Sequence, residues 1–127
     1  MTCSVLVVDD EPMTRTLLQL MLAPADYEVY EAGDGFEALE KIEQQKPDIM
    51  ILDVMMPNMD GLMLCRILRE REDTVNTPII LLSAKTTPDA IQEGLIAGAN
   101  RYLTKPVSRK DLLESLAELL DGMPSKA

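Results

Sequence analysis

Histidine is absent from the 127 residues of this chain. The protein therefore cannot use an imidazole as a general base, a metal ligand or a phosphoryl carrier. Cysteine is scarce as well, because Cys3 and Cys65 are the only two and their spacing matches no zinc, redox or disulfide motif. We interpret both as small packing residues of a reduced, cytoplasmic protein.

Long apolar runs and an excess of basic residues are also missing. No apolar stretch approaches the roughly 20 residues needed to span a bilayer, and the first residues do not resemble a secretory signal. The 22 acidic residues outnumber the 12 basic ones, which gives a net charge of −10. Nucleic acid phosphates would be repelled by this charge, so we expect no direct DNA or RNA binding and no membrane attachment.

Apolar runs alternate with segments of helical periodicity along the whole chain. The unbroken, branched runs in "SVLVVD", "DIMILD" and "TPIILLSA" are typical of strands buried on both faces. The more polar "YEVYEA" is expected at a sheet edge, and "NRYLTKP" as a short last strand. Because a helical segment follows each strand, the sequence predicts an α/β protein with a parallel sheet and helices on both faces.

This alternation fits a single domain, which we place at residues 1–127 with a core at 4–121. For the first helix, we place Met13, Leu17, Met21 and nearby leucines on the inner face. The expected helix caps are Pro12 at the start of the first helix, Thr87 or Thr86 before the fourth, Ser108 before the last, and Gly122 after its end.

Polar residues follow the predicted strands at the carboxyl edge of the sheet, where folds of this kind bind ligands. They are Asp9 and Asp10 after the first strand, Asp53 after the third, Ser83 after the fourth and Lys105 after the fifth. If the fold is right, three carboxylates, a hydroxyl and an amine converge at one edge.

The three carboxylates suit a hard divalent cation such as Mg²⁺, which prefers oxygen ligands. A cation would also relieve repulsion, which is about 3 kcal/mol for two like charges at roughly 5 Å and an effective dielectric constant of about 20. The run "DDE" after the first strand could equally cap the following helix. That interpretation leaves Asp53, at the end of another buried strand, without a role.

Four motifs in this order and spacing resemble the receiver domain of two-component response regulators: "VLVVDDEP", "ILDVMMPNMDG", "IILLSAK" and "GANRYLTKP". The resemblance spans about residues 4–121. It implies a flavodoxin-like, doubly wound fold of five βα units with strand order 2-1-3-4-5. It also implies a signalling phosphoacceptor that assists its own phosphorylation and dephosphorylation, rather than an enzyme.

The resemblance assigns roles to the strand-end residues. Asp53 would be phosphorylated, Lys105 would pair with the phosphoryl group, and Ser83 would form a hydrogen bond to it. The implied ligands of Mg²⁺ or Mn²⁺ are the carboxylates of Asp9, Asp10 and Asp53 and the backbone carbonyl of Met55. In addition, Tyr102 fits the family's switch aromatic, acting together with Ser83; Pro106 fits a cis proline; and Gly61 closes the loop after Asp53.

The implied phosphoryl donor is a histidine kinase or a histidine phosphotransfer protein, and the implied receiver of the signal is a downstream effector protein or domain. A homodimer is also compatible with the family. Asn100 and Arg101 stand where DNA-binding members often carry acids. We therefore favour a partner protein or an attached domain over a DNA-bound dimer.

Other functions fit less well. A phosphatase of the haloacid dehalogenase type needs a second acid where this chain has Met55. A flavodoxin-type cofactor site would be repelled by "VDDEPMT" after the first strand, and the dinucleotide motif G-x-G-x-x-G is missing. The main alternative is a degenerate receiver that acts only as a phosphorylation-independent protein-binding module.

Overall fold

Five strands form one parallel sheet in the order β2-β1-β3-β4-β5, in a computed structural model that describes residues 3–121. The strands are β1 (Cys3–Val8), β2 (Tyr27–Ala32), β3 (Ile49–Asp53), β4 (Ile79–Ser83) and β5 (Arg101–Thr104). The helices are α1 (Pro12–Leu22), the 3-10 turn η1 (Ala23–Ala25), α2 (Gly35–Gln44), α3 (Gly61–Glu70), α4 (Pro88–Ala97) and α5 (Arg109–Asp121). The expected fold class and strand order are confirmed.

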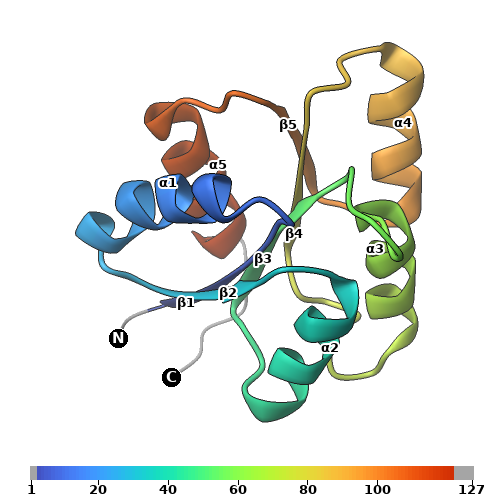
Figure 1. Cartoon of the computed structure of the whole chain (residues 1–127), viewed down its shortest axis with the longest axis horizontal. Helices are drawn as coiled ribbons and strands as arrows, with labels where there is room; N and C mark the ends of the chain where they lie inside the picture. The colour runs from blue at the N-terminus through green and yellow to red at the C-terminus, as the bar shows by residue number, and fades with distance from the viewer. Residues whose placement is uncertain (1–2, 122–127) are drawn as a thin grey trace.

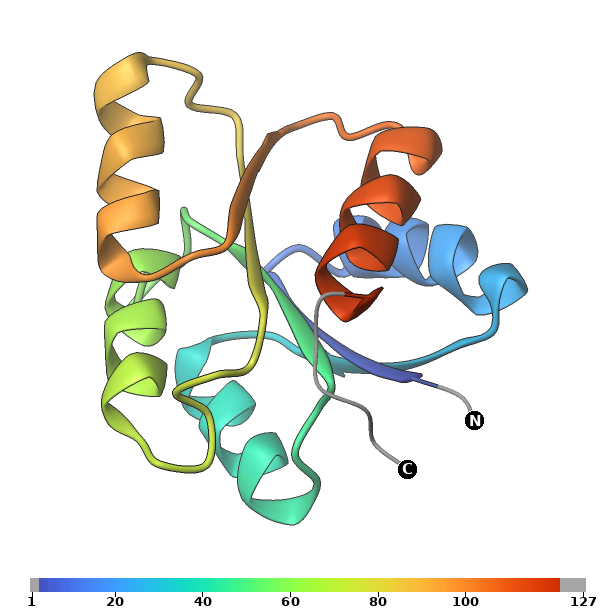
Figure 2. The same ribbon diagram turned by 180° about the vertical axis from the view of Figure 1, so that it is seen from behind.

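The helices cover both faces of the sheet, as Figures 1 and 2 show. Helices α1 and α5 lie on one face, and α2, α3 and α4 lie on the other. The side chains of β1 therefore divide between two cores. Leu6 and Val8 pack on the side of α2, α3 and α4, whereas Val5 and Val7 pack on the side of α1 and α5. A strand covered on both sides needs apolar residues at every position, which explains the unbroken apolar run.

The inner face of α1 differs from the expected one. Met13 is 82% exposed and Leu17 is 51% exposed, while Leu18 and Leu22 are buried and Met21 packs beside them. The prediction was wrong for Met13 and Leu17 because the apolar residues of α1 cover more than half of the helix circumference. Its leucines and methionines satisfy more than one helical face, so periodicity alone does not define which face is covered.

Most helix boundaries follow the expected caps. Pro12 is the first residue of α1, and the Thr87 hydroxyl accepts a hydrogen bond from the backbone N–H of Ala90 at 3.2 Å. The Ser108 hydroxyl accepts one from the N–H of Asp111 at 3.0 Å. The expected cap at Gly122 lies outside the described residues.

The described residues also include the helices and the two cysteines considered from composition. Across residues 3–121, no helix combines the length and apolar character that a membrane crossing requires. Cys65 lies on the buried face of α3, Cys3 is partly buried, and both are free thiols. Their interpretation as packing residues agrees with this environment.

Candidate functional site

The register of the sheet brings two acids together at its carboxyl edge. Val8 pairs with Leu52 across β1 and β3, so Asp9 and Asp53 follow at neighbouring positions. Both are almost fully buried, with 1% and 4% of their surface exposed. Carboxylate oxygens of Asp9, Asp10 and Asp53 all lie within 4.8 Å of one another. The predicted convergence of the three acids is therefore found.

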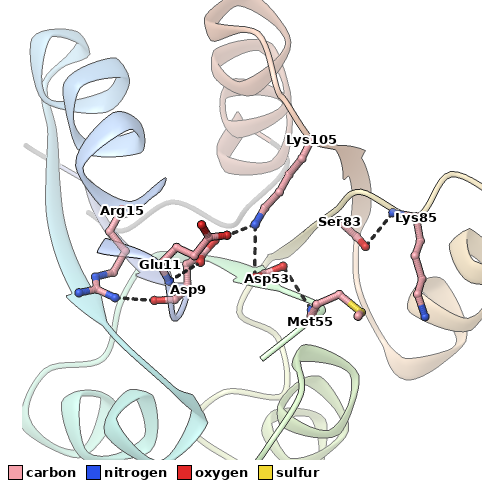
Figure 3. A network of polar contacts seen from close by, with 8 residues as sticks. All are labelled: Asp9, Glu11, Arg15, Asp53, Met55, Ser83, Lys85 and Lys105. Carbon is pink, nitrogen blue, oxygen red and sulfur yellow. Dashed lines mark hydrogen bonds and ion pairs between the residues drawn. The ribbon is translucent and has the colours of Figure 1, made fainter. Parts of the chain in front are cut away.

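Lys105 reaches the same point from the end of β5. Its Nζ lies 3.0 Å from Asp9 Oδ2 and 3.3 Å from Asp53 Oδ2 (Figure 3). Asp10 adds a third carboxylate at the exposed side of the cluster. One ammonium therefore faces three carboxylates, and the site keeps an excess of negative charge that a divalent cation would neutralise.

The burial and crowding of these groups perturb their proton affinities. Desolvation raises the pKa of Asp53 above its usual value, and the charge of Asp9 raises it further, while Lys105 acts in the opposite direction. Burial lowers the pKa of Lys105, but its hydrogen bond to Asp9 and the charge of Asp53 more than offset that effect, so its pKa is raised. Ionised Asp53 is thus disfavoured, and charged Lys105 is favoured.

Backbone groups orient both buried carboxylates. Asp9 Oδ1 accepts a hydrogen bond from the N–H of Glu11 at 2.9 Å, and Asp53 Oδ1 accepts one from the N–H of Met55 at 3.2 Å. The other oxygen of each carboxylate faces Lys105. Oxygen donors held in this way, with a net negative charge, fit the requirements of Mg²⁺.

Ser83 ends β4 beside this cluster, and its hydroxyl accepts a hydrogen bond from the N–H of Lys85 at 3.1 Å. The side chain is completely buried. Tyr102 lies on β5, and its hydroxyl donates to the carbonyl of Lys85 at 2.9 Å. Ser83 and Tyr102 therefore contact the same residue of the loop between β4 and α4.

The loops around the acids are also built as expected. The N–H of Gly61 donates to the carbonyl of Val54 at 3.0 Å, which closes the loop after β3. A Cβ at Gly61 would collide with the backbone carbonyl of Asp53, so only glycine allows this close approach. The Lys105–Pro106 peptide is cis, as the resemblance implied.

Arg15 is part of the site but was missed by the sequence analysis. Its Nη1 donates to the backbone carbonyl of Asp9 at 2.6 Å, and its Nε donates to Glu31 Oε1 at 3.0 Å. The available signal was a basic residue one turn into the helix that follows the acids. That signal is weak, because basic residues are common on exposed helix faces.

The whole domain resembles proteins of known class. The family model described as the response regulator receiver domain matches residues 5–117. The alkaline phosphatase synthesis transcriptional regulatory protein PhoP of Bacillus subtilis is 44% identical over 112 residues, which are 88% of this chain and 46% of that protein. The chain spans about half the length of the curated relatives it matches.

Two solved structures show the same fold. The chemotaxis protein CheY4 of Vibrio cholerae superposes with a TM-score of 0.89 at 38% identity, over 94% of this chain and all of that one. The receiver domain of the sensor histidine kinase PA1611 of Pseudomonas aeruginosa superposes with a TM-score of 0.88 at 31% identity, over 96% of this chain and all of that one. That second structure has a magnesium ion coordinated in its active site cleft.

Proposed function

This chain belongs to the response regulator receiver domain family of two-component systems, and on that premise we propose that Asp53 accepts a phosphoryl group from a phosphohistidine on a partner protein. The observation that carries the proposal is the position of Asp53. It is buried at the end of β3, within contact of Lys105 and beside two further carboxylates.

In the proposed transfer, a carboxylate oxygen of Asp53 forms a bond to phosphorus while the bond from phosphorus to the donor imidazole breaks. Lys105 would neutralise charge on the transferred oxygens, and the Ser83 hydroxyl would donate a hydrogen bond to one of them. The Ser83 hydroxyl keeps its own proton while it accepts from the N–H of Lys85, and the Lys105 ammonium has further N–H donors besides the one to Asp9, so both can donate to a phosphoryl oxygen. Turning toward that oxygen would loosen their present contacts. Arrival of the phosphoryl group therefore rearranges the site.

We further propose that the carboxylates of Asp9, Asp10 and Asp53 and the backbone carbonyl of Met55 hold Mg²⁺ or Mn²⁺. The excess negative charge of the cluster supports this ligand set, and so does the magnesium ion in the related PA1611 receiver domain. When bound, the cation supplies charge neutralisation and orientation for the transferred oxygens.

The site supports acceptance of a phosphoryl group rather than turnover of a separate substrate. Met55 occupies the position where a second acid would have to donate a proton to a leaving group. We therefore propose that the domain is a signalling acceptor and not an enzyme, although its own residues assist the transfer and the later hydrolysis.

The surface beside Lys105 supports docking of the donor, a histidine kinase or a histidine phosphotransfer protein. Met13, Leu17 and Leu20 expose their side chains along α1. A cavity of about 320 Å³, lined by residues of α1 and by Pro106 and Val107, adjoins them. An apolar surface of this kind, next to the acceptor, suits an amphipathic helix that carries the phosphohistidine.

The output is proposed to pass through residues 88–121 to a downstream effector protein, an attached domain or a second copy of the chain. The curated relatives are about twice as long as this chain, which is consistent with an attached output domain in them. The net charge of −10 argues against direct nucleic acid binding by this domain.

Incubation with acetyl phosphate and Mg²⁺ tests the acceptor role. We expect one added phosphoryl group by intact mass, on Asp53 by peptide mapping, and none when the metal is chelated. Asp53→Asn should abolish the label, whereas the control Asp89→Asn, at an exposed position of α4, should keep it. A label on Asp9 or on a serine would refute the assignment. An unlabelled wild type would favour the phosphorylation-independent binding module.

A further inference from the structure

The side chain of Arg15 contacts the acidic site at a backbone carbonyl, that of Asp9, and not at one of the three clustered carboxylates. Its guanidinium donates to the carbonyl oxygen of Asp9 and to the carboxylate of Glu31, at 2.6 Å and 3.0 Å. Figure 3 shows the side chain extending from α1 to the point where β1 ends. The Arg15 side chain is 20% exposed and that of Glu31 is 35% exposed, so the pair is partly shielded from water.

This contact completes the immobilisation of Asp9. The N–H of Asp9 donates to the carbonyl of Ala32 at 3.1 Å, Oδ1 accepts from Glu11, and Oδ2 accepts from Lys105. The backbone carbonyl is the remaining polar group of Asp9, and it accepts the hydrogen bond from Arg15. That carbonyl belongs to the peptide that links Asp9 to Asp10, so its orientation decides where the backbone of Asp10 points.

Glu31 has a separate effect on the same guanidinium. An arginine is charged at every physiological pH and presents several N–H donors in a fixed plane. Without a partner on β2, the guanidinium of Arg15 is free to turn toward the carboxylates of Asp9 and Asp10 and to compete with a cation. The ion pair with Glu31 holds it on the backbone side of the cluster.

We propose that Arg15, held in place by Glu31, is a positioning residue for the divalent cation site. It orients the peptide between Asp9 and Asp10 so that both carboxylates face Asp53. This inference rests on the proposed cation site, and it extends that site by two residues that do not touch the ion.

Calorimetric titration with Mg²⁺ tests the inference, alongside thermal unfolding in a chelator. Arg15→Gln should weaken Mg²⁺ binding by about tenfold, the size expected when a residue that orients a metal ligand is lost. Arg15→Lys should recover part of the affinity, because an ammonium can reach the Asp9 carbonyl but cannot bridge to Glu31 in a planar fork.

A double-mutant cycle separates positioning from simple charge effects. Glu31→Gln should weaken Mg²⁺ binding in the wild type and have little effect in the Arg15→Gln background. An equal loss in both backgrounds would mean that Glu31 acts only as a distant charge, and it would overturn its proposed role. If Arg15→Gln does not fold, Glu31→Gln and Arg15→Lys test the inference, because unchanged affinity in both would refute it.

Arg71→Gln is the matched control, since Arg71 is a second arginine with two acceptor partners, the carboxylates of Glu43 and Asp73, but lies at the end of α3. It should leave Mg²⁺ affinity unchanged. If Arg15→Gln leaves the Mg²⁺ affinity unchanged and only lowers the unfolding temperature, Arg15 stabilises the fold without positioning the metal ligands, and the inference is overturned. If the wild type itself binds no Mg²⁺, the proposed cation site fails and this inference fails with it. Labelling of Asp53 is measured separately.

Discussion

The burial of Asp53 has two opposite consequences for its proposed role. Its burial at the end of β3 excludes water from the reacting carboxylate, and the same burial, next to Asp9, disfavours its ionised form. Lys105 offsets only part of this effect. We therefore expect the ionised form of Asp53, the residue that is proposed to react, to destabilise the metal-free fold.

Asp53→Asn should raise the stability of the metal-free protein at neutral pH. Removing one of two adjacent buried negative charges should increase the free energy of unfolding by about 1–3 kcal/mol. Urea unfolding at neutral pH in the presence of a chelator measures this difference. A less stable Asp53→Asn variant would show that the ion pair with Lys105 outweighs the repulsion from Asp9.

The same variant gives a pH dependence with a defined sign. Because the pKa of Asp53 is raised in the folded protein, the folded state binds this proton more tightly than the unfolded state does. The destabilisation by ionised Asp53 is therefore present above the folded pKa and disappears as the pH falls toward the usual aspartate value. The advantage of Asp53→Asn should shrink over that range. An advantage that stays constant with pH would contradict the raised pKa.

At the scale of single elements, α4 and β5 pack through a glycine. A Cβ at Gly94 would lie 2.8 Å from the ring of Tyr102 and 2.9 Å from Leu81 Cδ1. Gly94 is therefore required for the close approach of the Tyr102 ring to α4, and this approach lets the tyrosine hydroxyl reach the carbonyl of Lys85.

Gly94→Ala should destabilise the domain even though alanine is the better helix former. Alanine contributes about 1 kcal/mol in a helix interior, but the overpacking against Tyr102 should cost about 1–3 kcal/mol. Urea unfolding gives the net change, and the amide resonance of Thr86, which shares a peptide group with the Lys85 carbonyl, should shift as the hydrogen bond from Tyr102 is disturbed. Glu93→Ala, at the exposed neighbour, is the control and should change stability by less than the glycine variant. A Gly94→Ala variant that is more stable than the wild type would show that the Tyr102 ring can move away from the added methyl group at little cost.

At the scale of the whole molecule, the proposed signal must travel from the acid cluster to residues 88–121. Ser83 and Tyr102 connect the two regions, because each contacts Lys85 in the loop before α4. A phosphoryl group adds about −1.5 to −2 charge at one point. It would draw the Ser83 hydroxyl toward itself and so free the N–H of Lys85.

Beryllofluoride, a stable mimic of an aspartyl phosphate, tests this connection. We expect amide shifts in NMR to spread from Asp53 through Ser83 to residues 88–121. In Ser83→Ala, the shifts near Asp53 should persist while those in 88–121 become smaller. Shifts confined to the acid cluster in the wild type would rule out this switch.

The order of the elements and the chemistry of the site follow from local patterns in the sequence. Unbroken apolar runs require strands covered on both faces, and the parallel arrangement of such strands puts their carboxyl ends at one edge. For this reason the residues that follow the strands, Asp9, Asp10, Asp53 and Lys105, are predictable as one group, and they do meet in the fold. Each of these patterns spans only a few consecutive residues.

Packing between distant segments selects among local choices that the sequence leaves equivalent. The apolar surface of α1 allows more than one inner face, and only packing against the sheet buries Leu18 and Leu22 and leaves Met13 and Leu17 exposed. The bridge that Arg15 forms to Asp9 and Glu31 ties α1 to the end of β1 and to β2, and it exists only once the helix has packed against these two strands. Long-range contacts of this kind depend on the distances between packed elements, and no local periodicity or spacing in the chain specifies those distances.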